Sequence, residues 1–434
     1  MPTGHVPRLG FLLLLISLGS FAALGQTDDR SLPNLHTSAS QGFASQLAEL
    51  RLNSYAYYFG RSVAVGADTV AVGTPFSGGA NTAFVFVEPR SGWSNISPSA
   101  FLVPSDGGDP SQNFGASIAV SEDGSTVVVG ASQYNDYFGT SVGPGKLYVF
   151  VRPPGGWLGP ITEIAQLSAS DGMTGDALGF SVSINGSTIV GGAPGSPPYD
   201  QPTAAYVFVE PAGGWKTSTQ TARLSTIDGL GRVGTSVSIS GNTIAVGAPY
   251  SGAGTVALFV EPAGGWVNMT PTAELTSAGQ ISGGLMGSSV AINGPLVAAG
   301  GPSASVGSNQ YEGAVYIFAE PPGGWVNATQ SDVLIEPDGK SDDGFGSAVA
   351  MTSNTIVVGS PYYTRGFNTA FWVEGAAFAL AKSSGGWSCA PMHGADARYY
   401  ALLGASVGIS GREVVTGAPD LGHAAGSVYV FELQ

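Results

Sequence analysis

The sequence predicts an all-β fold in which seven small sheets close into a ring, and three observations support this prediction. First, 66 of the 434 residues are glycine and only 10% are charged, a composition typical of strands joined by tight turns. Second, one pattern of short β-like runs recurs seven times along the chain. Third, the first and last copies of the pattern are incomplete in complementary ways.

The first strand of each unit is predicted by a glycine that precedes a small residue and a β-like run. FGRSVAV and FGASIAV are two copies, and six of the seven copies carry a serine two residues after the glycine. The copies begin at Phe59, Phe114, Leu178, Val233, Met286, Phe345 and Leu403. Each unit spans about 57 residues, a period typical of stacked or radial repeats.

The second strand ends in a sequence close to Gly-Ala-Pro. Its glycine lies thirteen residues after the first glycine in six units, as Gly247 follows Gly234. Gly130 is displaced by two residues because SEDGS (121–125) lengthens the preceding turn. Most of these turns have two residues, such as Asn185–Gly186, which suits a β-hairpin.

An aromatic run such as AYVFV predicts the third strand, and an A-x-L run predicts the fourth. Between them, six units carry a Gly-Trp element, which is EPAGGW in two copies. We expect these tryptophans to pack against the neighbouring sheet, and a sugar-stacking role is the alternative. They are Trp93, Trp157, Trp215, Trp266, Trp325 and Trp387.

The two ends of the chain indicate how the ring closes. The seventh unit ends at SVYVFELQ without a fourth strand, while LAELRL (47–52) is a fourth strand with no unit before it. A closed ring uses this surplus strand, because closure protects sheet edges. The sequence therefore predicts a seven-bladed β-propeller of four-stranded blades, closed by an N-terminal strand that completes the last blade.

These motifs resemble the FG-GAP repeats of integrin α-subunit propellers, and the GGW variation resembles the secreted bacterial type. The resemblance covers nearly everything from about residue 46 onward and implies binding or cell adhesion. Some family members hold calcium in a D-x-D-x-D-G loop between the first two strands. Here only VSEDGST (120–126) is longer than a minimal turn, and in PDGKSDDG (337–344) Lys340 stands where a ligand is needed. We expect no cofactor; calcium is the alternative, although the calcium loop of the family is absent from this sequence.

The N-terminus indicates export. FLLLLISLG (11–19) has the length of a signal-peptide core and is too short to span a bilayer, although an N-terminal anchor is the alternative. We therefore expect a signal peptide at 1–25, a leader or linker at 26–45 and the propeller at 46–434. The mature chain is expected to be secreted or at the cell surface, with no membrane span.

Charge and cysteine usage narrow the partners. A net charge of −15 argues against nucleic acid, because phosphate binding needs clustered Lys and Arg. Cys389 is the only cysteine, so disulfides cannot stabilise the chain. We expect a monomer that binds an extracellular protein or a glycan.

The long and varied loops that follow the second and fourth strands are expected on one face of the ring. Rigid scaffolds carry function in such loops, and aromatic and acidic side chains suit recognition. Packing of these aromatics onto the blade ends is the alternative. The ligand-binding candidates are Tyr137, Phe138, Tyr199, Tyr311, Tyr362, Tyr363, Asp109, Asp176, Asp342 and Asp343.

No catalytic residue is assigned from the sequence. A serine repeated at one position of six units is expected to be structural, since six nucleophiles in one ring are implausible. The main hypothesis is a non-catalytic recognition propeller. The alternative is a hydrolase or lyase acting on an extracellular glycan or ester, with paired carboxylates such as Asp342 and Asp343 at the ring mouth. A structural surface-layer component is a third possibility.

Overall fold

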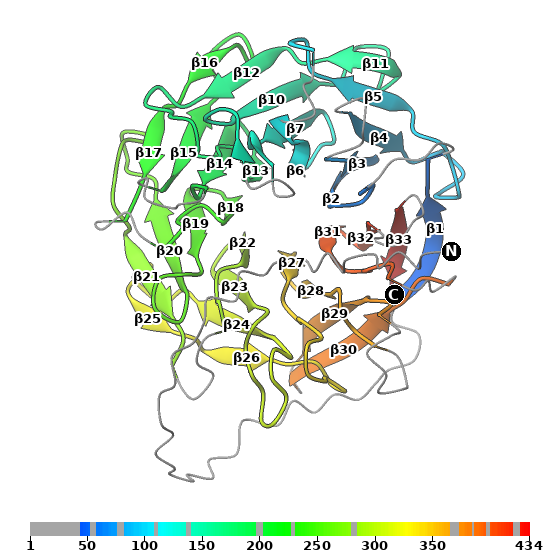
Figure 1. Ribbon diagram of the computed structural model, residues 1–434, viewed down its shortest axis with the longest axis vertical. Helices are drawn as coiled ribbons and strands as arrows, with labels where there is room; N and C mark the ends of the chain where they lie inside the picture. Colours follow the sequence, from blue (N-terminus) through cyan, green and yellow to red (C-terminus); the bar gives the residue numbers. More distant parts are fainter. Residues whose placement is uncertain are drawn as a thin grey trace, which may run out of the picture. The chain divides into compact units, whose positions relative to one another are not determined.

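The computed structural model describes a ring of β-sheets (Figure 1). The chain divides into two compact units, Met1–Asn34 and Leu35–Gln434, and every described residue lies in the second. The described residues are 44–52, 58–75, 82–107, 112–135, 140–196, 203–226, 231–278, 284–364, 373–383, 386–395, 400–419 and 426–434. They form strands, turns and loops, and the predicted seven-bladed β-propeller is confirmed.

Each blade is an antiparallel meander whose first strand lies nearest the axis (Figure 1). Blade 1 consists of β2 (Ser62–Gly66), β3 (Thr69–Gly73), β4 (Ala83–Val87) and β5 (Ala100–Val103), and blade 2 of β6 (Phe114–Val120), β7 (Thr126–Ala131), β10 (Lys146–Val151) and β12 (Ala165–Ser168). Blade 3 consists of β13 (Ser181–Asn185), β14 (Thr188–Ala193), β15 (Ala204–Val209) and β17 (Ala222–Leu224). Blade 4 consists of β18 (Ser236–Ser240), β19 (Thr243–Ala248), β20 (Thr255–Val260) and β21 (Ala273–Thr276).

The remaining blades repeat this order. Blade 5 consists of β22 (Ser289–Asn293), β23 (Leu296–Gly301), β24 (Ala314–Ala319) and β26 (Asp332–Leu334). Blade 6 consists of β27 (Ala348–Met351), β28 (Thr355–Ser360), β29 (Ala376–Ser383) and β30 (Gly386–Met392). Blade 7 consists of β31 (Ser406–Ser410), β32 (Glu413–Ala418), β33 (Ser427–Leu433) and β1 (Ala44–Leu50). A small hairpin of β8 (Tyr134–Asn135) and β9 (Thr140–Ser141) extends from blade 2.

The N-terminal strand completes the last blade, as predicted. β1 pairs antiparallel with β33, from Ala44 opposite Leu433 to Leu50 opposite Val428. In Figure 1 the blue β1 lies beside the dark red β33. Ala48 and Leu50 of this strand are buried, so closure adds apolar burial to the backbone hydrogen bonds.

Three blades have a fifth strand that the sequence did not predict. The segment after the tryptophan of one blade runs parallel to the outermost strand of the preceding blade. β11 (Gly159–Thr162) pairs with β5, β16 (Ser218–Thr219) with β12, and β25 (Ala328–Thr329) with β21. At the same position Asn95 accepts a hydrogen bond from the Glu49 amide of β1 at 2.8 Å. These segments cover edges that would otherwise expose unpaired backbone groups.

The six tryptophans are buried, as predicted, with at most 8% of each residue exposed. Two of them also bond to a neighbouring blade. Trp93 donates from Nε1 to Glu413 at 2.7 Å, and Trp387 donates to Asp332 at 2.8 Å. Rings buried to this extent present no face to a sugar, so their role in this structure is packing.

The repeated serine joins neighbouring blades. In six units its Oγ donates to the carbonyl oxygen of the first motif glycine in the next blade, at 2.7–2.9 Å. The last of these bonds runs from Ser406 to Gly60 and so closes the ring. We call these contacts the interblade serine bonds. They engage every one of these hydroxyls and support the structural role expected from the sequence.

The two motif glycines are required where the blades meet. The first has a φ near +90° in all seven units, and its carbonyl oxygen lies over the second glycine of the preceding blade. A Cβ on that second glycine would lie 1.9–2.2 Å from this oxygen. No side chain fits in that space, which explains why the motif is constant.

Blade 6 lacks an interblade serine bond, because Ala348 occupies the serine position opposite Gly404. We expect Ala348→Ser to raise the free energy of unfolding by about 1 kcal/mol, the usual value of one net hydrogen bond. Ser406→Ala should lower it by a similar amount. Equilibrium denaturation in urea measures both changes. A less stable Ala348→Ser protein would show that blade 6 does not share the geometry of the others.

Candidate functional site

The described parts of the loops after the second and fourth strands meet on one face of the ring, as expected, and we call this the loop face. Hydrogen bonds join the two kinds of loop in several blades. Gly195 donates to the Asp176 carbonyl at 3.0 Å, and Tyr250 donates to the Gly231 carbonyl at 3.2 Å. Tyr362 donates to the Asp343 carbonyl, also at 3.2 Å. The opposite face carries the short turns between first and second strands and the Gly-Trp turns.

Five of the ten predicted ligand-binding residues lie together on the loop face where blade 5 meets blade 6. They are Tyr311, Asp342, Asp343, Tyr362 and Tyr363. Their loops are tied by backbone bonds: the Gly344 amide donates to the Tyr311 carbonyl at 3.2 Å, and the Asp342 amide donates to the Gln310 carbonyl at 2.9 Å. Tyr137, Phe138, Tyr199 and Asp109 lie outside the described residues.

The predicted aromatic residues at this junction differ in exposure. Tyr311 and Tyr362 are 42% and 36% exposed. Tyr363 is half-buried, with its ring centroid 5.8 Å from that of Phe378 and 5.6 Å from that of His393. The alternative of packing onto a blade end therefore describes Tyr363, whereas Tyr311 and Tyr362 present accessible rings.

The predicted acidic residues also divide into two groups. Asp342 is exposed, whereas Asp176 and Asp343 are buried. Both buried aspartates shape equivalent turns: Asp176 accepts from the Met173 amide and Asp343 from the Lys340 amide, each at 2.7 Å. Their carboxyl groups are directed into these turns in this structure, so of the predicted acidic residues at the junction Asp342 is the one presented to solvent, beside the exposed Asp338 of the same segment.

The sequence analysis did not predict two buried carboxyl groups that lie beside Asp343. Glu312 and Glu336 are 3% and 2% exposed, and Asp343 is 1% exposed. We call these three side chains the carboxyl cluster. Burial, reinforced by the nearby Asp343 charge, raises the pKa of Glu336 to about 8. Burial likewise raises the pKa of Asp343 to about 6 and raises that of Glu312.

The repeat alignment contains the signal that could have revealed Glu336. The equivalent residue of the other units, two places after the last residue of the A-x-L run, is never charged. These residues are Pro104, Ala169, Thr226, Ser277, Gly394 and Leu52. The bonding partner of Glu336 is also unusual, because Ser360 replaces an alanine found in four other blades (Ala131, Ala193, Ala248 and Ala418). Blades 5 and 6 therefore share a polar pair that the rest of the ring lacks.

A further exposed aromatic residue lies on the loop face at blade 4. Tyr250 is 53% exposed, and the Arg232 guanidinium lies 5.1 Å from its ring centroid and 5.9 Å from that of Phe180. Tyr250 directly follows the Gly-Ala-Pro motif, as Tyr362 follows Gly-Ser-Pro in blade 6. This shared repeat position is the signal that the sequence analysis overlooked.

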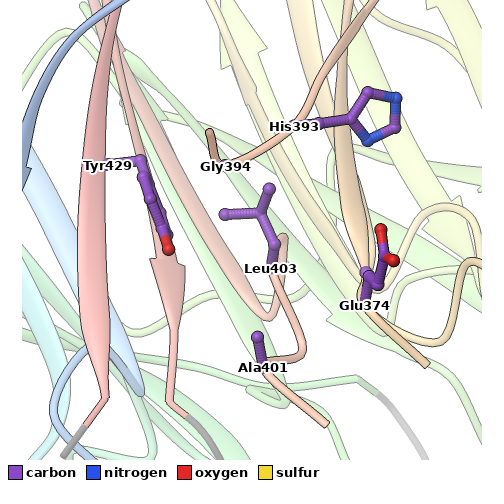
Figure 2. Close-up of a pocket in the computed structure, with 7 residues that line it drawn as sticks. Glu374, His393, Gly394, Ala401, Leu403 and Tyr429 are labelled. Carbon is purple, nitrogen blue, oxygen red and sulfur yellow. The ribbon is translucent and has the colours of Figure 1, made fainter. Parts of the chain in front are cut away.

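A small pocket lies between blades 6 and 7. Tyr429 lies on one side of it and Glu374 and His393 on the other (Figure 2). Its volume of ≈ 10 Å³ suits a single water molecule and is far below that of a ligand site. Its lining residues are Glu374, Gly375, His393, Gly394, Ala401, Leu403 and Tyr429.

The longer turn in blade 2 is held by its own aspartate. Asp123 accepts hydrogen bonds from the Ser121 hydroxyl at 2.5 Å and from the Ser125 amide at 3.0 Å. Within the described ranges, no group of three or more His, Cys, Asp or Glu side chains could hold a metal ion. In the same part of the chain, no helix is long and apolar enough to cross a bilayer.

The comparison with protein families identifies the repeat. The model of the FG-GAP repeat matches residues 161–208 and 328–378. Both matches have the same phase, since each includes the last strand of one blade and the first three strands of the next. The chain has no significant match among curated proteins.

Proposed function

We propose that this seven-bladed propeller of FG-GAP repeats is a recognition module that binds an extracellular protein or a glycan through its loop face. FG-GAP repeats are typical of extracellular or surface proteins, and the fold suggests a binding role. The proposal includes secretion or display at the cell surface, a monomeric state and no cofactor. The observation that carries it is the difference between the two faces of the ring.

The two faces differ in their chemistry. The first-to-second strand turns are two-residue turns in most blades, with glycines in the left-handed region such as Gly186 and Gly241. The residues that follow the Gly-Trp turns on the same face expose aliphatic side chains: Leu158, Val267 and Val326. The loop face instead presents aromatic and acidic side chains to solvent: Tyr250, Tyr311, Tyr362 and Asp342. Tyrosine rings supply flat apolar contact with a polar hydroxyl, and carboxylates accept hydrogen bonds from sugar hydroxyls or peptide amides.

The carboxyl cluster is the observation that favours the second candidate, a hydrolase or lyase. Clustered carboxyl groups with raised pKa values are typical of general acid–base sites. Glu336 and Asp343, however, are at most 2% exposed, so no substrate reaches them in this structure. Recognition therefore remains the main proposal. Sustained turnover of a glycan or ester by the wild-type chain, lost in Glu336→Gln, would reverse this order.

The test of recognition is the double variant Tyr311→Ala/Tyr362→Ala. On glycan and extracellular-protein arrays, we expect the signal of spots bound by the wild-type chain to fall at least about tenfold, because buried aromatic contacts dominate interfaces. Val267→Ala/Val326→Ala is the matched control, since both valines are more than half exposed and follow a Gly-Trp turn on the opposite face. Unchanged binding by the tyrosine variant would exclude this junction as the binding site.

A further inference from the structure

We propose that the carboxyl cluster of Glu312, Glu336 and Asp343 is a pH-sensitive lock that holds the loops carrying Tyr311 and Tyr362 together while Glu336 is protonated. Ionisation of the cluster loosens these loops. The lock is a property of the junction between blades 5 and 6, and only its effect on binding rests on the proposed function.

The cluster joins three segments of the chain. Glu312 lies in the loop between β23 and β24, while Glu336 and Asp343 lie in the segment that leads from blade 5 to blade 6. Ser360, at the end of β28 in blade 6, contacts this segment through its hydroxyl. All three carboxyl residues are at least 97% buried, so any charge they acquire is poorly solvated.

The hydrogen bonds of Ser360 point to a neutral Glu336. The Ser360 hydroxyl lies 2.9 Å from Glu336 Oε2 and 3.0 Å from the Asp343 carbonyl oxygen, but it has one proton to donate. A protonated Glu336 carboxyl can donate to Ser360 Oγ, and the Ser360 hydroxyl then donates to the backbone carbonyl of Asp343, so both contacts are hydrogen bonds. An ionised Glu336 carboxylate and the backbone carbonyl of Asp343 instead compete for the single hydroxyl proton of Ser360. Among the described residues, the other oxygen of Glu336, Oε1, has no hydrogen-bond partner.

The neighbouring charges do not neutralise an ionised cluster. Among the described residues, Lys340 is the basic residue whose charge acts on the cluster, where it lowers the pKa of Glu336 and Asp343 by less than burial raises them. Its ammonium donates to the Thr364 carbonyl at 2.7 Å, and no ion pair within the described ranges links it to the cluster. Asp342 adds a further negative charge beside Asp343. Cys389 of β30 also lies near Glu336, and burial raises the pKa of its thiol to about 12, so it stays neutral.

The cluster is directly connected to the exposed tyrosines. Glu312 follows Tyr311 in the chain and bonds to Asn309 in the same loop, with Asn309 Nδ2 2.8 Å from Glu312 Oε2. Asp343 accepts from the Tyr362 amide through its carbonyl, and the adjacent Gly344 amide donates to Tyr311. Repulsion within the cluster therefore acts on the backbone bonds that position both rings.

The direction of the pH effect follows from the raised pKa values. Burial in the closed loops raises the pKa of Glu336 from 4.5 to about 8 and the pKa of Asp343 from 3.8 to about 6. The closed state therefore binds more protons. Its stability is fully present at low pH, falls as pH rises from about 4, and levels off above about 8.

Hydrogen–deuterium exchange of the full chain tests the lock without any ligand. After correction for intrinsic rates, we expect exchange of peptides covering 309–313 and 342–364 to rise at least about tenfold between pH 6 and 8. In Glu336→Gln, which keeps the side-chain shape but cannot ionise, this rise should shrink at least about tenfold. Asp343→Asn, which retains the acceptor for the Lys340 amide, should shrink it less.

The matched control is Glu274→Gln, which removes the same charge from an exposed position on β21. It should leave the pH dependence unchanged. Wild-type exchange that does not change between pH 6 and 8, or an undiminished rise in Glu336→Gln, would overturn the proposal. Array binding at pH 6 and 8 is a separate readout. If exchange responds to pH but the wild-type chain binds no array spot at either pH, the lock is upheld and the recognition function is contradicted.

Discussion

Gly247→Ala should destabilise the propeller by about 3 kcal/mol or more, close to the upper range for overpacking a tight core. A Cβ at this position would lie 2.0 Å from the Gly287 carbonyl oxygen and 2.3 Å from Ser236 Oγ. These two atoms form the interblade serine bond between blades 4 and 5, at 2.8 Å. The added methyl group therefore forces two blades apart and breaks a buried hydrogen bond at the same point.

Gly264→Ala is the control for this prediction. Gly264 belongs to the EPAGGW turn and has no positive φ, and in the described part of the chain no atom lies within 4 Å of the place a Cβ would take. We expect a change within about 0.5 kcal/mol. Urea denaturation followed by circular dichroism compares the two variants. Equal midpoints for Gly247→Ala and Gly264→Ala would refute the steric account of the Gly-Ala-Pro glycine.

Trp157→Ala is expected to lower the free energy of unfolding by about 3–5 kcal/mol, the range for removing a buried large aromatic side chain. Trp157 is 1% exposed and packs in a cluster with Phe114, Tyr148 and Phe150 of blade 2. Its Nε1 donates to the Gly124 carbonyl at 3.0 Å, so truncation also removes a buried hydrogen bond and leaves that carbonyl with the longer bond from the Thr69 hydroxyl, at 3.3 Å.

Leu158→Ala is the adjacent control, because Leu158 is 69% exposed. Its replacement should leave stability within about 0.5 kcal/mol of the wild-type value. Thermal melting monitored by circular dichroism suits this pair. If both variants melted at the wild-type temperature, the Gly-Trp element would not be part of the core, and the sugar-stacking role would become the better explanation of its repetition.

The architecture could be predicted because it is encoded in local, repeated spacing. A first strand, a tight turn such as Asn185–Gly186 and a second strand recur with nearly constant separation, and seven copies make the pattern unambiguous. The surplus strand LAELRL indicated closure, and its pairing with β33 confirms it. The parallel strands β11, β16 and β25 were missed because two to four residues after a tryptophan carry no strand-like pattern.

The candidate site was predicted only in outline. Sequence position placed Tyr311 and Tyr362 at the ends of long loops, where the structure exposes them. The same reasoning treated Asp342 and Asp343 as a pair, although Asp342 is exposed and Asp343 is 1% exposed. Adjacent side chains in a turn point in different directions. The hydrogen bond from the Lys340 amide to the Asp343 carboxylate, which turns this side chain inward, is not visible in the sequence.

The sequence by itself determined the number of blades, the order of their strands and the closure of the ring, because these follow from periodicity along the chain. The tertiary structure decided which loop residues are accessible and which carboxyl groups share a buried site. Glu312 and Glu336 are separated by β24, a Gly-Trp turn, β25 and β26, and their charges interact only because two loops of blade 5 fold onto blade 6. Burial and electrostatic coupling depend on distances in space, which repeat spacing does not specify.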